Sequence, residues 1–311
     1  MLKIAKTGLF ICISRVFSVA LQTINQKRMT YQEFRQPLVS RYGQRESEAI
    51  ARYVMEVHYG LTQSQILTGS VEGLSTSELS AIRQRLLDGE PVQYVVGTAE
   101  FCGHRFHVEP GVLIPRPETE DLCRLIIDEV AATNHQSPHC SVLDIGTGSG
   151  CIACTLAAAM PHAQVTACDI STDALRIAAR NAQRIGVPVT FIHADILSTT
   201  ALQVLSPTLP CWDIIVSNPP YVCQNEQAQM ESNVLDYEPS LALFVPDDDP
   251  LLFYRAIARY AAHTLKPGGR LYLEVTPLYC ADTCQLLAGF GFTRTNVTPD
   301  RYGRQRIVTG A

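Results

Sequence analysis

The chain has 311 residues, of which 46% are hydrophobic and 18% are charged, a composition typical of a globular protein with one large and one small domain. Its formal net charge is −5, whereas a dedicated duplex-DNA binder usually carries a basic surface. The charge balance therefore disfavours a nucleic acid as the direct partner of this protein.

The first 28 residues form a leader with a composition of its own. They contain no acidic residue, and their basic residues are Lys3, Lys6, Arg15, Lys27 and Arg28. Their apolar stretch is interrupted by Arg15 and is too short to span a bilayer. The leader is interpreted as an upstream extension before a start at Met29, as an organelle transit peptide or as a secretory signal. We expect a cytoplasmic protein with no membrane partner, or an organelle protein if the leader is a transit peptide.

Residues 29–90 predict a small helical domain. Ser47–Tyr59 places apolar residues at helical spacing, and Ser75 offers N-cap chemistry to a second helix that Gly89 would end. The segment contains no constellation of catalytic residues. The sequence fits two roles equally well, namely a lid or stabilising cap and a surface that grips a macromolecular substrate.

Residues 91–117 predict a β-hairpin linker. Strand-forming residues from Val92 onward lie on both sides of Cys102-Gly103-His104, which we expect to form the turn. Several prolines then stiffen the chain. Thr119 is expected to cap the next helix, over residues 120–132.

Residues 118–311 are expected to form the large domain, because strand-like and helix-like segments alternate from Ser141 onward. The expected strands are Ser141–Ile145, Gln164–Cys168, Val189–His193, Trp212–Val216 and Arg270–Val275. The expected helices lie near residues 150–160, 171–186, 251–265 and 277–289. This alternation predicts an α/β fold with a doubly wound, mostly parallel sheet. Phe292–Thr298 and Gln305–Thr309 should add an antiparallel hairpin at its edge, which gives a seven-stranded sheet.

The 11 cysteines are interpreted as packing residues. Cys151 with Cys154, and Cys280 with Cys284, lie one turn apart on expected helices, and no second ligand pair stands at zinc-site spacing. We therefore expect no metal site. A thiol-rich chain without the pattern of a secreted disulfide scaffold also indicates a reducing compartment.

The stretch from Val142 to Gly150 predicts a strand, a glycine-rich turn and the start of a helix, a geometry that binds nucleotides. Its spacing is G-x-G-x-G, whereas the dinucleotide fingerprint is G-x-G-x-x-G/A and residue 151 is Cys, which disfavours NAD. Asp144 would repel a pyrophosphate and favour a cationic amino acid moiety. Since S-adenosylmethionine carries a sulfonium and an ammonium, charge selects it as the cofactor. The cofactor-binding residues expected in this turn are Gly146, Thr147, Gly148, Ser149 and Gly150.

Two further acids follow neighbouring strands, where open α/β sheets bind ligands. Asp169 ends the second strand and is expected to accept both ribose hydroxyls, with a helix N-cap as the alternative. Asp195 ends the third strand and is expected to accept from the adenine amino group, with Ile196 beside the ring. A plain turn aspartate is the alternative for Asp195.

Asn218-Pro219-Pro220-Tyr221 follows the fourth strand and is the most informative motif of the chain. None of these residues is an acid, a base or a strong nucleophile. A sulfonium methyl is already activated, so methylation of a planar amide requires alignment more than a base. The Asn218 side-chain oxygen and the Pro219 carbonyl can each accept one amide N–H, which aims the nitrogen lone pair at the methyl carbon. We expect Asn218, Pro219 and Tyr221 to be catalytic and Asn218–Tyr221 to bind substrate; prolines that merely end a strand are the alternative.

Further stretches carry a family resemblance. They are Gly89–Tyr94 with Gly97 and Glu100-Phe101, the octapeptide Leu113–Glu120 (LIPRPETE), and Tyr237-Glu238-Pro239 with Ala242-Leu243. Together with the glycine turn and Asn218–Tyr221, they make residues 29–311 resemble the HemK/PrmC-type protein-(glutamine-N5) methyltransferases. Departures are small: Ser149 stands where Thr is frequent, and Asp236-Tyr237 replaces a common Arg-Phe.

The resemblance implies a class I S-adenosylmethionine-dependent methyltransferase with a Rossmann-like fold and an N-terminal substrate-recognition domain. It implies methyl transfer from S-adenosylmethionine to the Gly-Gly-Gln glutamine of peptide chain release factors, which modulates translation termination. By this resemblance Gly146–Gly150, Asp169, Ile196 and Asn218 match cofactor-binding positions, and Asn218–Tyr221 match the glutamine-binding loop. The alternatives are an amino-methyltransferase acting on adenine, and a non-catalytic module that binds a partner through its helical segment.

Overall fold

The computed structural model describes residues 29–68, 74–132, 140–205 and 211–311. The chain divides into two compact units, Met1–Val96 and Gly97–Ala311, and the division falls inside the segment expected to be a linker. The predicted leader, residues 1–28, lies outside the described residues. No helix of the described ranges is long and apolar enough to cross a membrane.

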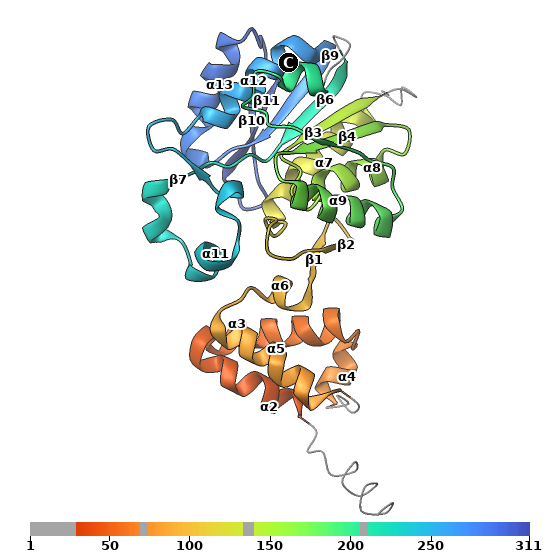
Figure 1. The fold of residues 1–311 in the computed structure, drawn as a ribbon, viewed down its shortest axis with the longest axis vertical. Coiled ribbons are helices and arrows are strands. Elements are labelled where there is room, and N and C mark those ends of the chain that lie inside the picture. Colours follow the sequence, from red (N-terminus) through yellow and green to blue (C-terminus); the bar gives the residue numbers. More distant parts are fainter. Residues whose placement is uncertain (1–28, 69–73, 133–139, 206–210) are drawn as a thin grey trace, which may run out of the picture. The chain divides into compact units, whose positions relative to one another are not determined.

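The first unit is helical over its described residues (Figure 1). Its helical segments are α2 (Tyr31–Arg35), η1 (Gln36–Leu38), α3 (Val39–Tyr53), η2 (Val54–His58), α4 (Gln63–Leu67), α5 (Thr76–Asp88) and α6 (Val92–Val96). The helix expected at Ser47–Tyr59 is confirmed in α3 and η2. The expected cap is also confirmed, because the Ser75 side chain accepts from the N–H of Glu78 and Gly89 ends α5 with a φ of 97°.

The strand expected from Val92 is wrong, since Val92–Val96 forms the short helix α6. The Pro91 carbonyl accepts hydrogen bonds from the N–H groups of Tyr94 and Val95, both at 3.0 Å. Tyr94 and Val95 are buried, and Val95 belongs to the apolar core of the first unit. β-branched residues favour strands only weakly, so burial against the neighbouring helices overrides their propensity.

The hairpin begins after this helix, with β1 (Thr98–Phe101) antiparallel to β2 (His104–His107). The expected turn is confirmed: Cys102 and Gly103 connect the strands with φ angles of 47° and 78°. A buried amide on the neighbouring helix α9 (Thr172–Ile185) holds the hairpin in place. Asn181 accepts from the N–H of His107 at 2.7 Å and donates to its carbonyl at 2.9 Å.

Helix α7 spans Pro117–Ala132, so the expected start at residue 120 and the expected cap at Thr119 are wrong. Proline is well suited to the first position of a helix, because its fixed φ is helical and its missing N–H would be unpaired there. Thr119 consequently lies inside the first turn. Its hydroxyl donates to the Glu274 carboxylate at 2.7 Å instead of capping the helix.

The predicted seven-stranded, doubly wound sheet is confirmed in the second unit. Its strands are β3 (Ser141–Ile145), β4 (Gln164–Asp169), β5 (Thr190–His193), β6 (Trp212–Ser217), β9 (Leu265–Glu274), β10 (Thr295–Pro299) and β11 (Gln305–Gly310). Their order is β10-β11-β9-β6-β3-β4-β5. The pairs among β3, β4, β5, β6 and β9 are parallel, while β11 runs antiparallel to β9 and β10. The β10–β11 hairpin therefore closes one edge, as expected.

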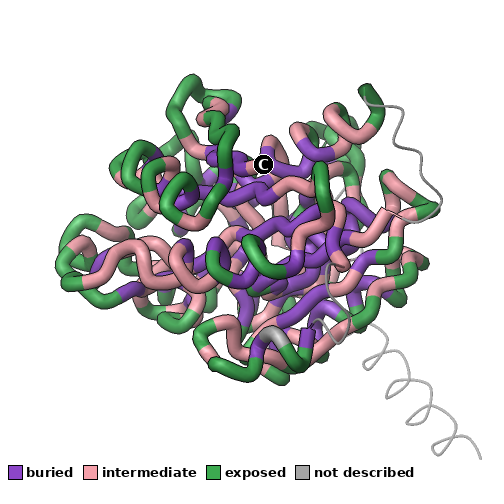
Figure 2. Tube along the Cα trace, turned by 90° about the horizontal axis from the view of Figure 1, so that it is seen from above, coloured by how far each residue is buried: buried purple, intermediate pink, exposed green. Residues whose placement is uncertain are grey.

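Helices cover both faces of this sheet (Figure 1). They are α7, α8 (Cys151–Ala159) and α9 (Thr172–Ile185) on one face, and α10 (Ala201–Leu205), α12 (Leu252–Thr264) and α13 (Cys280–Gly289) on the other. Alternation along the strands separates the two cores: Val142 faces the first group, and Leu143 faces the second. Buried residues, drawn purple in Figure 2, accordingly gather along the central strands.

Most of the described cysteines, all of which were expected to be packing residues, lie in or against these cores, while Cys12 lies outside the described residues. Cys151 and Cys154 are buried on the α8 face, and Cys280 is buried on the α13 face. Within the described ranges, no group of three or more His, Cys, Asp or Glu side chains could hold a metal ion.

An excursion between β6 and α12 was not predicted from the sequence. Its elements are β7 (Val222–Cys223), η3 (Gln224–Gln229), α11 (Ser232–Tyr237), η4 (Ser240–Ala242) and β8 (Phe244–Val245). The two short strands pair in parallel, with Val222 opposite Phe244. The excursion therefore leaves from Asn218–Tyr221 and returns beside it, so that both of its ends are anchored near the carboxyl edge of the sheet.

Candidate active site

A cavity of about 360 Å³ lies at the carboxyl ends of the parallel strands, where ligands bind in open α/β sheets. The predicted site residues that line it are Gly146, Thr147, Gly148, Ser149, Asp169, Asp195, Ile196, Asn218, Pro219 and Pro220. Gly150 and Tyr221 are not among the lining residues. The structure thus brings residues of the glycine turn, both strand-end acids and most of the Asn-Pro-Pro-Tyr motif to one space.

The glycine turn is shaped for close approach of a ligand. Gly146 and Gly148 have φ angles of 73° and 54°, and a Cβ at either position would meet no atom within 4 Å. Gly150 differs, because a Cβ there would lie 2.9 Å from the Cβ of Ala178 on α9. The first two glycines therefore leave space on the cavity side, whereas Gly150 allows α8 and α9 to pack closely.

Asp144 lies beneath the turn and does not line the cavity. It is fully buried, and one carboxylate oxygen accepts from the Thr147 hydroxyl at 2.6 Å and from the N–H of Ala153 at 3.2 Å. The other oxygen has no hydrogen-bond partner among the described residues. Burial raises the pKa of Asp144 to about 7. The expected influence on a cationic ligand would therefore be exercised from below the turn, and the direct structural role of Asp144 is to shape it.

Asp169 joins the turn to the end of β4. One of its oxygens accepts from the N–H of Gly148 at 2.9 Å, and the other accepts from the N–H of Ser171 at 2.8 Å. Burial raises the pKa of this carboxyl group. The N-cap alternative is wrong, because Ser171 caps α9 through the N–H of Ala174. Each carboxylate oxygen has further lone pairs, so Asp169 can also accept from hydroxyls in the cavity.

Asp195 and Ile196 border the cavity beyond β5. One Asp195 oxygen accepts from the N–H of Leu197 at 2.8 Å, which is the turn geometry considered as the alternative. This contact leaves the second oxygen of Asp195 for a ligand, so the turn and a binding role are compatible.

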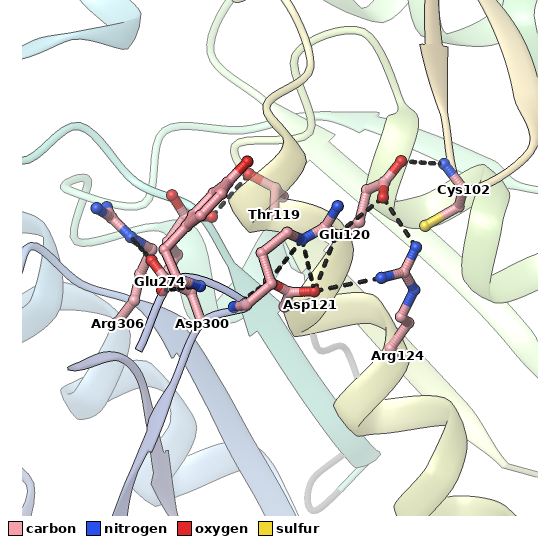
Figure 3. Close-up of polar contacts among 10 residues, drawn as sticks. Cys102, Thr119, Glu120, Asp121, Arg124, Glu274, Asp300 and Arg306 are labelled. Atoms are coloured by element: carbon pink, nitrogen blue, oxygen red, sulfur yellow. Dashed lines mark hydrogen bonds and ion pairs between the residues drawn. The ribbon is translucent and has the colours of Figure 1, made fainter. Parts of the chain in front are cut away.

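Asn218 is placed by the pairing of β6 with β3. Ser217 lies opposite Ile145, and the Ser217 hydroxyl donates to the Ile145 carbonyl at 2.6 Å. The chain therefore emerges beside the glycine turn. The Asn218 side-chain nitrogen donates to the Thr119 hydroxyl at 3.2 Å. The Thr119 hydroxyl in turn donates to Glu274 (Figure 3). The asparagine oxygen is left as the acceptor that can meet an incoming N–H group.

Tyr221 points its hydroxyl at the same acid, donating to Glu274 at 3.5 Å. Burial raises the pKa of Tyr221, so the phenol stays protonated at neutral pH. Glu274 is 1% exposed, and burial raises its pKa to about 7. A single buried carboxyl group at the end of β9 thus meets Thr119 and Tyr221, and through Thr119 it reaches Asn218.

An ion pair joins two segments at the rim of the cavity. The guanidinium of Arg116 donates to the Glu238 carboxylate at 2.5 Å, and the same carboxylate accepts from the N–H of Ile114 at 3.1 Å. Arg116 and the neighbouring Pro115 line the cavity, as does Pro239, which follows Glu238. The pair therefore fixes the distance between the octapeptide Leu113–Glu120 and the excursion after β6.

Thr119, Glu274 and Glu238 were not predicted as parts of the site. For Arg116 the sequence leaves two roles open, a position bordering the cleft and a structural hinge, and the structure places Arg116 in the cavity lining. A signal existed for Glu274, since an acid in the apolar segment Leu271–Val275 is unusual in a strand that is otherwise buried. Thr119 and Glu238 lie in stretches that supported the family resemblance, and the sequence assigned neither of them a role in the site. The paired side chains are far apart in sequence, because 155 positions separate Thr119 from Glu274 and 122 separate Arg116 from Glu238.

This chain is similar in sequence to known methyltransferases. A family model described as "Methyltransferase small domain" matches residues 110–236. A release factor glutamine methyltransferase of Bacteroides thetaiotaomicron is 43% identical over 278 residues, covering 88% of this chain and 96% of that relative. Proteins of the same name from Flavobacterium psychrophilum and Chlorobaculum tepidum are 38% and 40% identical, covering 89% and 78% of this chain and 95% and 82% of the relatives. With the seven-stranded sheet, these matches identify the expected class I methyltransferase fold.

Proposed function

The chain belongs to the release factor glutamine methyltransferase family, and we propose that it methylates the N5 side-chain amide nitrogen of a glutamine in a peptide chain release factor. The methyl donor is S-adenosyl-L-methionine, and the glutamine is that of the Gly-Gly-Gln motif, whose methylation modulates translation termination. One observation carries the proposal: Asn218 and Pro219 line the same cavity as the glycine turn after β3. A cofactor cradle and an amide clamp border one space.

The residues of the cavity fit the proposed cofactor. The volume of about 360 Å³ lies in the usual range of small-molecule pockets. The space beside Gly146 and Gly148 is open to a ligand, and a side chain at either position would occupy part of it. The buried Ser149 hydroxyl has no hydrogen-bond partner in the described structure, which leaves it for a polar ligand group. Asp169 would hold ribose hydroxyls, and Asp195 with Ile196 would hold the adenine.

Alignment is the contribution of the chain to the reaction. When bound, S-adenosylmethionine supplies an activated methyl group. The Asn218 side-chain oxygen accepts one hydrogen of the substrate amide, and the Pro219 carbonyl accepts the other. With both hydrogens held, the amide nitrogen presents its lone pair toward the cofactor side of the cavity. Such positioning can lower a barrier by about 7–11 kcal/mol at best. Tyr221 supports the clamp from outside the cavity lining through its contact with Glu274.

We assign recognition of the protein substrate to the N-terminal helical domain, residues 29–90, with residues 91–117 as the linker and residues 118–311 as the methyltransferase domain. The first unit has a core of its own around Phe34, which allows it to present a fixed surface. A release factor is thus the proposed partner, and neither a nucleic acid nor a membrane is. A cytoplasmic location stays a prediction, because the leader lies outside the described residues.

The test is methylation of a purified release factor with isotopically labelled S-adenosylmethionine, followed by mass mapping of the product. We expect one labelled glutamine, within Gly-Gly-Gln. Label in adenine of DNA, offered in parallel, would instead support the alternative enzyme. Absence of cofactor binding would support the non-catalytic alternative.

The matched variants are Asn218→Ala and Asn225→Ala. Asn225 is an exposed residue of the same excursion and does not line the cavity. Asn218→Ala should abolish methylation while leaving cofactor binding largely intact, because it removes an acceptor for the substrate amide. Asn225→Ala should behave as wild type. Retained turnover in Asn218→Ala would contradict the proposed mechanism.

A further inference from the structure

Glu274 is a buried acid to which the proposed mechanism gives only a contact with Tyr221. It ends β9, and its neighbours Leu273 and Val275 are fully buried. Removing a carboxyl group from water is unfavourable unless hydrogen bonds compensate for the lost solvation, and an apolar residue often stabilises such a position better. A contribution to stability therefore does not explain why residue 274 is a glutamate. Its contacts with Thr119 and Tyr221 offer a different one.

The two hydrogen bonds that connect Asn218, Thr119 and Glu274 have the same donor-to-acceptor direction. A threonine hydroxyl has one proton, and that of Thr119 is donated to Glu274 at 2.7 Å. The remaining lone pairs of Thr119 can only accept. The partner on that side is the Asn218 side chain, which must therefore present its nitrogen, as it does at 3.2 Å. Because an amide has nitrogen on one side and oxygen on the other, the asparagine oxygen is turned away from Thr119.

We propose that Thr119 and Glu274 are positioning residues for the transfer proposed above, fixing which atom of the Asn218 amide meets the substrate. The inference rests on the proposed role of Asn218. The Glu274 carboxylate holds the Thr119 proton, and Thr119 in turn holds the Asn218 nitrogen. The arrangement matters because a substrate –NH2 group needs an acceptor, and a reversed Asn218 would offer it a second donor.

The direction of the hydrogen bond between Thr119 and Glu274 depends on whether Glu274 is ionised, and neighbouring charged groups influence that ionisation. Arg306 on β11 favours the ionised form, while Glu118 on α7 opposes it. Arg306 is itself held by Asp300 at 3.1 Å (Figure 3), and the Tyr254 hydroxyl of α12 donates to the backbone carbonyl of Glu274 at 3.2 Å. An ionised Glu274 can only accept. A protonated one would donate to Thr119, free the Thr119 proton for the Asn218 oxygen and reverse the amide.

The first experiment compares Thr119→Val with Thr119→Ser. Valine keeps the shape of the side chain and removes the hydroxyl, so kcat should fall about 10- to 100-fold, the effect expected of a misaligned reactant. Serine restores the hydroxyl and should restore most of the rate. The control is Thr283→Val on α13, where a buried threonine hydroxyl has no hydrogen-bond partner in the described part of the chain. Its kcat should equal that of wild type.

Three further measurements distinguish a positioning role of Thr119 and Glu274 from a merely structural one. The affinity of Thr119→Val for S-adenosylmethionine should stay within about threefold, so that the loss lies in kcat. Wild-type kcat should fall toward acid with an apparent pKa near that of Glu274, about 7, and Glu274→Gln should lack this limb. The double variant Thr119→Val/Glu274→Gln should be no slower than the slower single one, because both interrupt one chain of hydrogen bonds.

The outcomes separate the inference from the proposed function. If wild-type protein methylates no glutamine amide, the proposed function fails. If wild type is active and Thr119→Val keeps full kcat, the inference is overturned and the function stands. Equal losses in Thr119→Val and Thr119→Ser, or losses that add in the double variant, would also overturn it. The two Thr119 variants decide the matter even if Glu274→Gln does not fold.

Discussion

Replacement of Arg116 by alanine should loosen the rim of the cavity. Arg116 is the charged partner of Glu238, whose side chain is 1% exposed, while that of Arg116 is 33% exposed. After the change, the carboxylate keeps the N–H of Ile114 at 3.1 Å as its remaining donor. The octapeptide Leu113–Glu120 and the excursion after β6 would then be joined through that backbone contact.

The magnitude follows from this geometry. Removing one partner of a fully buried pair costs about 3–5 kcal/mol, because an uncompensated charge stays behind. Here Arg116 is one-third exposed, so water can enter the vacated space and solvate Glu238. A hydrogen bond to a charged group contributes about 1.5–3 kcal/mol. We therefore expect the free energy of unfolding to fall by about 2–3 kcal/mol.

The single tryptophan of the chain supplies the assay. Trp212 lies in β6, is buried and donates to the Tyr260 hydroxyl at 2.8 Å, so its fluorescence follows unfolding of the unit that carries the site. Denaturant titrations of wild type and Arg116→Ala give the difference in unfolding free energy. The matched control is Arg105→Ala, because Arg105 pairs with Glu100 at 3.3 Å and both side chains are more than half exposed.

Exposed pairs contribute about 0–1 kcal/mol, so Arg105→Ala should lose little stability. Arg116→Lys keeps a cation and should recover part of the loss. The reasoning is refuted if Arg116→Ala and Arg105→Ala are equally stable. Because Pro115 and Pro239 line the cavity on either side of the pair, Arg116→Ala should also raise KM.

Two further predictions concern the glycine turn and the pH dependence of stability. Gly150→Ala should lower the free energy of unfolding by about 3 kcal/mol in the same fluorescence titration. The reason is that Gly150 has a φ of 80° and that a Cβ there would lie 2.9 Å from the Cβ of Ala178. A loss below about 1 kcal/mol would contradict this account. Burial raises the pKa values of Asp144 and Glu274 to about 7, so the stabilising contribution of both groups is present at low pH and is lost as pH rises through about 7. Unfolding free energy should therefore fall between about pH 4, near the unfolded-state pKa values, and about pH 7. Asp144→Asn should flatten that fall, and equal slopes for wild type and variant would show the interpretation to be wrong.

The sheet was predictable because its signals are local. Strands such as Trp212–Val216 are short apolar segments, and helix-like segments alternate with them along the chain, a pattern typical of a parallel sheet. The glycine turn and Asn218–Tyr221 each occupy consecutive positions, so their chemistry could be interpreted without knowledge of distant contacts. Their shared cavity followed from topology, since strands that end at one edge bring their loops together.

Other features depended on contacts that no local pattern encodes. Val92–Val96 has the residues of a strand and forms a helix because its environment buries it. Threonine is a residue type that often caps helices, yet the Thr119 hydroxyl donates to Glu274, which lies 155 positions away. The excursion after β6 has short elements with little periodicity, and it is shaped by its anchored ends. Sequence therefore located the pieces of the site more reliably than the links between them.

Those links explain how a site without a strong base can still select one orientation of its substrate. A neutral amide such as Asn218 can face either way at similar energy, so its own chemistry does not decide which atom meets a substrate N–H. A carboxylate only accepts, and placing Glu274 behind Thr119 removes that ambiguity. In some proteins a buried polar group specifies a unique arrangement although an apolar residue at its position would be as stable. An apolar residue at position 274 should accordingly fold well and align poorly, a separation that a stabilising role for Glu274 would not produce.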